Sequence, residues 1–558
     1  MWRIWLAFSL LIICFTGIIT RLFFWQVISS YNLKAEAMSQ YQEELILPAN
    51  RGSIFSGDGY PLVINKNASL VYEEPPNISN ISEFTKIVAR HMDISEATLS
   101  AELSVPGRLW YPIEHKVDEE KISDLKNLGI KGLGFEKEPK RYYPEASMAA
   151  HLLGFVGFSE NGEDRGYFGL EGYHDRELKG KKGSMALEKD VSGAPIPVGN
   201  AVRVEPENGS SLILWIDRTI QNIVEEKLKA GIEKYGAKDG SVVVMDPTTG
   251  GILAMASFPS YSPQKYMDFE KSAYKNPVVA SSYEPGSTLK ALVMAAALDK
   301  GVIKSSTEFD ETGPVTIGEY TIRTWNNEYH GKITMTQVLE YSSNVGMVQV
   351  EKLLGKDHLI KFFKDIGLGI PTNVDLEDEG SPQMRNDKNW TEIDLATASF
   401  GQGIAVTPLQ MIRGIAAIAN GGFLMEPHVV KMIRSADGKT IEIKPKKIRQ
   451  VFKNSTAGVV TEMMTSAVDN GEAKWAKPKG YRIAGKTGTA QIPVAGHYDD
   501  KKTITSFVGF APADKPRFVM LVTLCEPTSS QWGSETAAPL FFSIAKDLFL
   551  YLGIPAQI

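Results

Sequence analysis

Cysteine is nearly absent from this chain of 558 residues, which contains only Cys14 and Cys525. Cys14 lies in an apolar run at the N-terminus, and Cys525 lies in an apolar, strand-like segment near the other end. If the first run lies in lipid, the two cannot pair, so the fold is not built on disulfides. The eight histidines are scattered, with no H-E-x-x-H pattern and no cysteine partners at ligand spacing. The sequence therefore predicts no metal site and no cofactor.

An excess of positive charge is missing as well. The formal net charge is -6, which gives no electrostatic reason to expect a nucleic-acid partner. Low-complexity tracts are also absent, and a composition of 43% hydrophobic and 23% charged residues is typical of a globular protein. A chain of this length is too long for one ordinary domain, so two or three are expected.

Long hydrophobic runs are rare, and the one that stands out is residues 4–20, which carry no charge. Arg21 interrupts the run before it continues to Trp25. A helix over this stretch reaches roughly 30 Å, enough to span a bilayer core. Arg21 can extend to the interface and Trp25 suits an interfacial position, so residues 1–28 are predicted to form a transmembrane anchor.

The positively charged N-terminus favours a cytoplasmic N-terminus, with the rest of the chain outside the cytoplasm. A cleaved signal peptide is the alternative, because Ala35-Glu36-Ala37 has the form of a cleavage site. That tripeptide lies well beyond the apolar run and follows Lys34, which favours an uncleaved anchor. A buried core helix fits poorly at a chain start that is followed directly by polar sequence.

The pattern of charged and apolar residues changes near residue 210. Residues 29–209 are mixed and charged, and they are predicted to form a non-catalytic domain. Beyond them, strands at 241–245 and 252–256 flank a hairpin signal, and a second strand pair is expected at 505–510 and 518–524. A helix is expected at about 219–235 and another at 538–551, and residues 287–470 are expected to be mainly helical. This order predicts an α+β domain over 210–558, an antiparallel sheet flanked by helices, whose first and last segments meet in the sheet.

Ser287 and Lys290 form an S-x-x-K pattern, which is weak by itself. The same pattern also occurs at Ser123–Lys126, Ser262–Lys265, Ser272–Lys275 and Ser543–Lys546. Ser287 differs because Glu284-Pro285-Gly286 breaks the chain just before it and a thoroughly apolar helix follows. Ser287 is then expected in the first turn, where its backbone N–H has no intrahelical partner and can face a developing oxyanion. The spacing places Lys290 on the same helix face.

A serine hydroxyl becomes a good nucleophile only when a base takes its proton. Lys290 can be that base only if it is neutral for part of the time, which desolvation and a second cation favour. Lys486 is the candidate for that cation. The alternative for Ser287 is an ordinary helix N-cap, a common place for serine before an apolar helix.

Two further patterns follow downstream. Ser342 is a candidate relay between Lys290 and a leaving group, and Asn344 is a candidate for holding a substrate amide. The alternative is a plain turn between helices, since S-x-N also occurs at Ser30–Asn32 and Ser159–Asn161.

The run Lys486-Thr487-Gly488-Thr489 is predicted to lie on a strand. Gly488 is expected to let a ligand backbone approach closely, while Lys486 and the hydroxyls of Thr487 and Thr489 suit a terminal carboxylate. The N–H groups of Thr489 and Ser287 are the candidate oxyanion hole. The alternative is a glycine-containing strand with an exposed lysine. The three patterns together, in this order, predict a serine acyl-transfer site of the kind found in penicillin-binding proteins and class A β-lactamases.

The chain resembles a class B penicillin-binding protein over nearly its whole length. Outside the catalytic motifs, the resemblance rests on Arg51–Ile54, Arg141–Pro144, His151–Gly157, Gly169–Gly172 and Gly533–Pro539. In the last segment Ser534 stands where a second glycine is expected. The resemblance implies a membrane anchor (1–28), an elongated, dimerisation-like pedestal (29–209) and a D,D-transpeptidase domain with a serine β-lactamase-like fold (210–558). Tyr283–Ser287 and Ser342–Asn344 are more similar to the septal branch than to the elongation branch.

The implied reaction is peptidoglycan cross-linking outside the cytoplasm, by an enzyme anchored in the bacterial cytoplasmic membrane. Ser287 attacks the D-Ala–D-Ala bond of a donor stem peptide, and an amine of a neighbouring stem peptide resolves the acyl-enzyme. β-Lactams are then expected to acylate Ser287. The resemblance further implies a glycan polymerase of the SEDS type, and other division or elongation proteins, as partners.

Other functions share some of these features. A β-lactamase or β-lactam sensor has the same three motifs, but class A hydrolysis uses a glutamate to activate water, and the sequence shows no clear counterpart. A D,D-carboxypeptidase differs only in its acceptor. An elongation-branch transpeptidase and a non-catalytic envelope scaffold are further alternatives, and the intact Ser287, Lys290, Ser342, Asn344 and Lys486 count against the scaffold.

Overall fold

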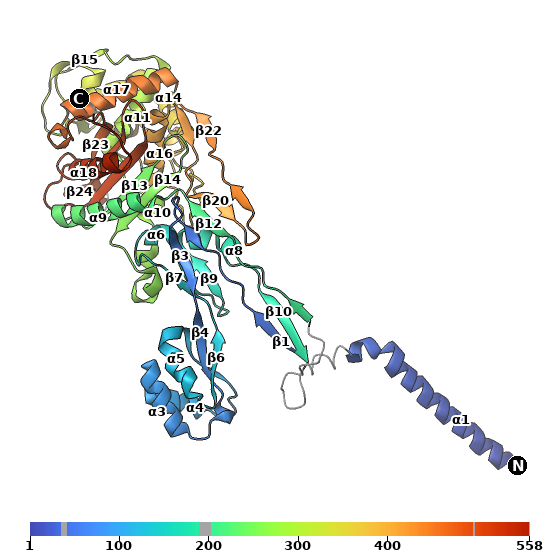
Figure 1. Cartoon of the computed structure of the whole chain (residues 1–558). Helices are drawn as coiled ribbons and strands as arrows, with labels where there is room; N and C mark the ends of the chain where they lie inside the picture. The colour runs from blue at the N-terminus through green and yellow to red at the C-terminus, as the bar shows by residue number, and fades with distance from the viewer. Residues whose placement is uncertain (35–41, 189–201, 495–496, 557–558) are drawn as a thin grey trace. The chain divides into compact units, whose positions relative to one another are not determined.

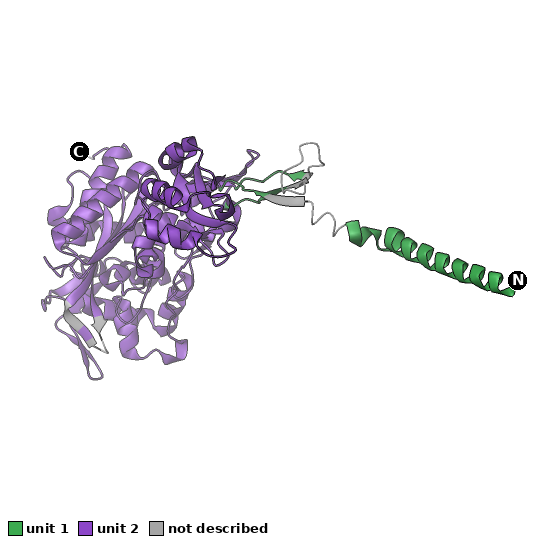
Figure 2. Cartoon of the chain, turned by 90° about the horizontal axis from the view of Figure 1, so that it is seen from below, with its two compact units in different colours: residues 1–51, 179–209 green, residues 52–178, 210–558 purple. Residues whose placement is uncertain are grey.

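The computed structural model describes the chain except residues 35–41, 189–201, 495–496 and 557–558. Contacts divide the chain into two compact units (Figure 2). One comprises residues 1–51 and 179–209, and the other comprises residues 52–178 and 210–558.

The smaller unit contains the N-terminal helix α1 (Trp2–Phe23), which continues as the π-helical turn η1 (Phe24–Ile28). None of its side chains is buried, and it is long and apolar enough to cross a membrane by length and composition. The same unit contains an antiparallel ribbon in the order β1-β10-β11, formed by β1 (Gln42–Leu47), β10 (Gly183–Glu188) and β11 (Val202–Val204).

The larger unit includes a lobe in which three helices cover a three-stranded sheet (Figure 1). Its elements are β4 (Ala68–Glu73), α3 (Ile81–Met92), α4 (Glu96–Leu103), β5 (Tyr111–Asp118), α5 (Glu119–Leu128) and β6 (Leu133–Lys137). Two of the helices begin where polar side chains cap them: Asn80 accepts from the N–H of Glu83, and Ser95 from that of Thr98. Their apolar faces then pack against Val71 of the central strand.

A six-stranded sheet joins segments from both sides of residue 210. Its order is β21-β20-β12-β2-β3-β7, and β12 pairs in parallel with β2. The strands are β2 (Ile54–Phe55), β3 (Pro61–Lys66), β7 (Lys140–Tyr142), β12 (Ser211–Leu214), β20 (Val430–Arg434) and β21 (Thr440–Glu442). One sheet therefore contains strands from both sides of the domain boundary predicted at residues 209 and 210. That boundary stays a prediction.

The sheet that positions the candidate site is five-stranded and antiparallel, in the order β14-β13-β25-β24-β23. Its strands are β13 (Asp239–Met245), β14 (Ile252–Phe258), β23 (Ala484–Val494), β24 (His497–Ala511) and β25 (Phe518–Cys525). β13 pairs directly with β25, with Val243 opposite Leu521. The predicted α+β architecture, with first and last segments meeting in an antiparallel sheet, is confirmed.

Both faces of this sheet are buried, which explains its unbroken apolar strands. Val242 and Val244 point into a core shared with α9 (Arg218–Tyr235) and α18 (Ala537–Tyr551). Val243 points to the opposite face, into a core shared with the buried helix α11 (Lys290–Lys300) and with α16 (Pro408–Ala419). Figure 1 shows α9 and α18 close together beside the sheet.

Residues 287–470 are less uniformly helical than the sequence predicts. Besides helices, they contain short hairpins between residues 308 and 334 and the paired strands β19 (Phe423–Met425) and β22 (Lys447–Gln450). These strands are only three or four residues long, so none shows a sequence periodicity that can be recognised.

Candidate active site

Ser287 lies in a short 3-10 turn, η5 (Gly286–Leu289), which leads directly into α11. It is half-buried, and it caps neither η5 nor α11, which lack a side-chain cap. The side chain that bonds back in this turn is Thr288, whose hydroxyl donates to the carbonyl of Pro285 at 2.6 Å. Ser287 therefore keeps its hydroxyl available, and within the described part of the chain no hydrogen bond to it is formed.

Lys290 is fully buried at the start of α11. Its Nζ donates to the carbonyl of Ser342 at 2.5 Å, to Asn344 Oδ1 at 2.8 Å and to Ser342 Oγ at 3.3 Å. Burial, and then the nearby Lys486 ammonium, hold the pKa of Lys290 well below its usual value. The amine is therefore in an environment that favours the neutral form a general base requires.

Ser342 connects α12 (Met335–Glu340) to α13 (Asn344–Leu354) with a left-handed backbone at φ +55°. This conformation costs a non-glycine residue energy and is common at functional sites. The Ser342 hydroxyl accepts hydrogen bonds from two amines, Lys290 Nζ at 3.3 Å and Lys486 Nζ at 3.0 Å. Ser342 thus joins the two lysines.

Both ends of the Asn344 side-chain amide are hydrogen-bonded within the protein. Its Oδ1 accepts from Lys290, and its Nδ2 donates to the carbonyl of Arg323 at 2.9 Å. A substrate amide bound there therefore has to share or replace one of these bonds.

Ser343, which is not among the predicted site residues, fixes this turn. It is the N-cap of α13, accepting from the N–H of Gly346 at 2.8 Å, and its hydroxyl also donates to the buried carboxylate of Glu311. Glu311 in turn accepts from the backbone N–H of His330 at 3.2 Å. The cap and the carboxylate hold Ser342 in its left-handed position.

Lys486 lies on β23 and is 3% exposed. Besides Ser342, it donates to Thr487 Oγ1 at 3.0 Å. Burial lowers its pKa to about 8, and the carboxylate of Glu472 opposes that shift. Lys486 is therefore buried, which excludes the alternative of a glycine-containing strand with an exposed lysine.

Gly488 packs closely against protein atoms, and the predicted close approach of a ligand backbone stays a prediction. A Cβ there would stand 2.3 Å from Ser506 Oγ and 2.8 Å from a methyl carbon of Thr288, so protein atoms fill the space. The absence of a side chain lets β23 lie against the turn that carries Ser287. Thr489 is similarly engaged, since its hydroxyl accepts from the N–H of Gly533 at 3.0 Å.

A cleft of about 270 Å³ opens at this point. Of the predicted residues, it is lined by Ser287, Ser342, Asn344, Thr487 and Thr489. Lys290 and Lys486 lie buried and are joined to the cleft through the Ser342 hydroxyl.

The cleft also contains residues that the sequence did not indicate. Trp325 and Trp532 come from distant segments and meet edge to face, with ring centroids 4.9 Å apart. Glu472 brings a carboxylate to the wall. None of the three belongs to a recognisable motif, because each is placed by tertiary packing alone.

Gly401 supports the turn that carries Ser287. Its carbonyl accepts from the N–H of Gly286 at 3.0 Å, its φ is +84°, and a Cβ there would stand 2.1 Å from the carbonyl oxygen of Gly286. Gly401→Ala is therefore expected to cost roughly 2–4 kcal/mol of stability, from backbone strain and the clash together. The substitution should also slow acylation at Ser287. Denaturant unfolding will measure the loss of stability, and a penicillin-labelling time course will measure the rate of acylation.

Gly438→Ala is the matched control. Gly438 has φ +85°, but nothing lies within 4 Å of a Cβ there. It should cost only the strain, about 1–2 kcal/mol, with labelling unchanged. Equal losses in the two variants would show that the contact with Gly286 does not matter.

Comparison with known families finds matches over most of the chain. Residues 240–548 match the penicillin binding protein transpeptidase domain, and residues 46–214 match the penicillin-binding protein dimerisation domain. The first match alone covers more than half of the chain.

Curated relatives align almost end to end. Stage V sporulation protein D of Bacillus subtilis is 33% identical over 97% of this chain and 84% of its own length. Peptidoglycan D,D-transpeptidase FtsI of Escherichia coli is 30% identical over 97% of this chain and 90% of its own length.

Solved structures have the same fold. Penicillin binding protein 3 of Mycobacterium tuberculosis, complexed with aztreonam, is 27% identical with a TM-score of 0.71, covering 92% of this chain and 98% of that one. A peptidoglycan synthetase from Bifidobacterium adolescentis is 25% identical with a TM-score of 0.75, covering 93% and 98%.

Proposed function

The chain belongs to the class B penicillin-binding proteins, in their septal branch, and from that membership we propose that Ser287 is the nucleophile of its D,D-transpeptidase reaction. The protein is a serine-type transpeptidase of peptidoglycan synthesis, and it binds β-lactams as its family does. The observation that carries the residue assignment is the hydrogen-bonded chain from Lys290 through Ser342 to Lys486, on the wall of the cleft that Ser287 also lines.

The first half of the reaction forms an acyl-enzyme. Ser287 Oγ attacks the carbonyl carbon of the penultimate D-Ala of a donor stem peptide, and neutral Lys290 takes the hydroxyl proton. The N–H groups of Ser287 and Thr489 hold the oxyanion. Lys486, with the hydroxyls of Thr487 and Thr489, holds the terminal carboxylate of the substrate.

Collapse of the tetrahedral intermediate breaks the peptide bond. The proton taken by Lys290 passes through the Ser342 hydroxyl to the leaving nitrogen, and D-Ala departs as a neutral amine. Asn344 orients the amide of the donor after exchanging one of its internal bonds. An acceptor amine then attacks the ester carbon, its proton returns to Ser287 Oγ by the reverse route, and a new amide cross-link forms.

The experiment that tests this function uses the full-length protein in detergent. A donor ending in D-Ala–D-Ala and an acceptor amine are supplied, and mass spectrometry follows free D-Ala and the cross-linked product. Both should form in equal amounts, and prior acylation by benzylpenicillin should block both. Release of D-Ala without a cross-linked product would instead indicate a carboxypeptidase.

The pKa of Lys486 predicts how acylation depends on pH. Because burial lowers that pKa to about 8, Lys486 is a cation below this pH and loses its charge above it. The rate constant for acylation by benzylpenicillin, which has a carboxylate, should therefore fall as pH rises through about 8. Quenched time courses of acylation between pH 6 and pH 9.5 measure this rate constant.

Lys486→Arg is the control for this pH dependence. Arginine stays charged throughout the range, so the fall should be absent even if the overall rate is lower. A wild-type rate that stays constant up to pH 9.5 would contradict the role given to Lys486.

The protein is a single-pass membrane protein by its N-terminal helix and its relatives. The finer topology that we propose has a cytoplasmic N-terminus and the catalytic part outside the cytoplasmic membrane. We keep 1–28 as anchor, 29–209 as pedestal and 210–558 as transpeptidase domain. The proposed partners of the anchor and pedestal are a SEDS-type glycan polymerase and other division or elongation proteins. Protease added outside intact spheroplasts should digest the catalytic part and spare an N-terminal tag.

A further inference from the structure

Glu472 lines the cleft but belongs to none of the three motifs. It lies in the turn between α17 (Asn454–Asn470) and β23. Its Oε1 is buried and has no hydrogen-bond partner among the described residues. A buried oxygen without a partner is costly and calls for an explanation, of which a catalytic role is one.

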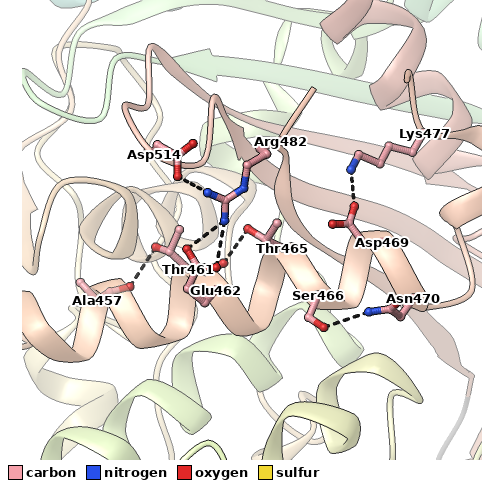
Figure 3. Close-up of polar contacts among 10 residues, drawn as sticks. All are labelled: Ala457, Thr461, Glu462, Thr465, Ser466, Asp469, Asn470, Lys477, Arg482 and Asp514. Atoms are coloured by element: carbon pink, nitrogen blue, oxygen red, sulfur yellow. Dashed lines mark hydrogen bonds and ion pairs between the residues drawn. The ribbon is translucent and has the colours of Figure 1, made fainter. Parts of the chain in front are cut away.

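The turn that carries Glu472 is held at both ends (Figure 3). Asp469, at the end of α17, pairs with Lys477, and Arg482 makes two bonds of 2.9 Å to Glu462 and a further bond to Asp514. The side chains of these pairs are partly exposed, and none of them lines the cleft. They fix the turn so that the Glu472 carboxylate stays on the cleft wall.

The end of α17 is also tied to the turn that carries Ser342. Asn470 Nδ2 donates to Ser466 Oγ at 3.1 Å, and Ser466 donates to the carboxylate of Glu340, two residues before Ser342. The Glu472 turn and the Ser342 turn are therefore positioned by the same helix end.

The charged groups that act on the pKa of Glu472 are the two lysines of the site. Both Lys486 and Lys290 lower its pKa, although burial, the larger effect, raises it. In return, Glu472 raises the pKa of each lysine against the effect of burial. Glu311 also raises the pKa of Lys290, but it is hydrogen-bonded to Ser343 and His330. Glu472 is thus the carboxylate without such partners that acts on both amines.

We propose that Glu472 is a positioning residue of this active site, whose carboxylate keeps Lys486 cationic and sets the pH range in which Lys290 is neutral and Lys486 charged. The inference rests on the roles proposed above for the two lysines. The inference adds Glu472 as a third titrating group beside Lys290 and Lys486. It also assigns a function to the unpartnered Oε1 of Glu472. Glu472 touches no reacting atom in this role; it acts through the lysines.

The sign of its effect follows from the charge. Removing a negative charge disfavours both ammonium groups, so both lysines lose their protons at lower pH in its absence. The acid limb of the acylation profile reports Lys290, which must be neutral, and the basic limb reports Lys486, which must be charged. In Glu472→Gln both limbs should therefore move to lower pH, by about one unit, the smaller end of what a close opposite charge produces.

The test measures the second-order rate constant for acylation by benzylpenicillin from pH 5.5 to pH 9.5, with the full-length protein in detergent. Wild type, Glu472→Gln and Glu472→Asp are compared, with thermal melting to show that each is folded. Glu535→Gln, which removes an exposed carboxylate that does not line the cleft, is the matched control. The proposal expects displaced limbs in the Gln variant, limbs closer to wild type in the Asp variant, and an unchanged control.

Two results would overturn the proposal. A rate that falls equally at every pH, with both limbs unmoved, would mean that Glu472 has only a structural role. An unmoved acylation profile together with a longer-lived acyl-enzyme in Glu472→Gln would mean that Glu472 activates water for hydrolysis. Wild type that forms no adduct on Ser287 is a separate outcome, and it would overturn the proposed function itself.

Discussion

Ser287→Ala is expected to form no covalent adduct with benzylpenicillin, whereas the wild type gains the mass of one intact penicillin molecule. Without the hydroxyl there is no atom to form the ester, and the remaining donors of the cleft can only bind. Loss of the serine nucleophile lowers kcat on the order of 10⁶-fold in a serine protease with a catalytic triad. Intact-mass spectrometry of the full-length protein after incubation with the drug measures the adduct directly.

Ser543→Ala is the matched control for this experiment. Ser543 and Lys546 have the same three-residue spacing, but they lie on α18, outside the cleft. That variant should be labelled like wild type. An adduct that persists in Ser287→Ala would contradict the assignment, and rapid drug turnover by wild type without a lasting adduct would indicate a β-lactamase.

Lys290→Met is expected to lower the rate of acylation by about 10³-fold or more while the protein stays folded. Removing a general base costs on the order of 10²–10⁴-fold, and here the same amine also begins the relay to the leaving group. Methionine is close to lysine in volume and is suited to a fully buried position, so packing around α11 should be kept. The time course of adduct formation by mass spectrometry gives the rate, and thermal melting shows that the variant is folded.

Lys300→Met controls for the loss of a lysine from the same helix. Lys300 is exposed at the C-terminal end of α11, far along the helix from the cleft residues. Its replacement should leave acylation unchanged. If Lys290→Met were acylated within tenfold of the wild-type rate, another group would have to be the base.

The membership of the chain in its family could be predicted from local patterns, because each motif is a short run with its own chemistry. Ser287 and Lys290 are three residues apart, and Lys486 through Thr489 are consecutive. Their order along the chain, together with a buried helix after Ser287, was enough to predict a serine acyl-transfer site. The antiparallel sheet was predictable for a similar reason, since its strands are apolar runs next to turn signals.

What the motifs could not show is how their side chains are bonded to one another. The Ser342 hydroxyl joins Lys290 and Lys486 because its backbone is left-handed, and that conformation depends on the Ser343 cap and the buried Glu311. Asn344 was predicted to offer its amide to a substrate, but the fold gives both ends of that amide to protein partners.

The sequence by itself thus determined the family and the chemistry, and it supplied the proposed reactive residues, because motifs depend on residue types at short spacings. Only the tertiary structure decided that Gly488 makes room for Thr288 and Ser506, and that Glu472 lies on the cleft wall with both lysines within electrostatic range. These facts depend on segments that are far apart in the chain and meet only when the sheet and its helices pack. A pattern read along the chain contains no information about such contacts, since they are set by the burial of apolar faces that lie elsewhere in the sequence.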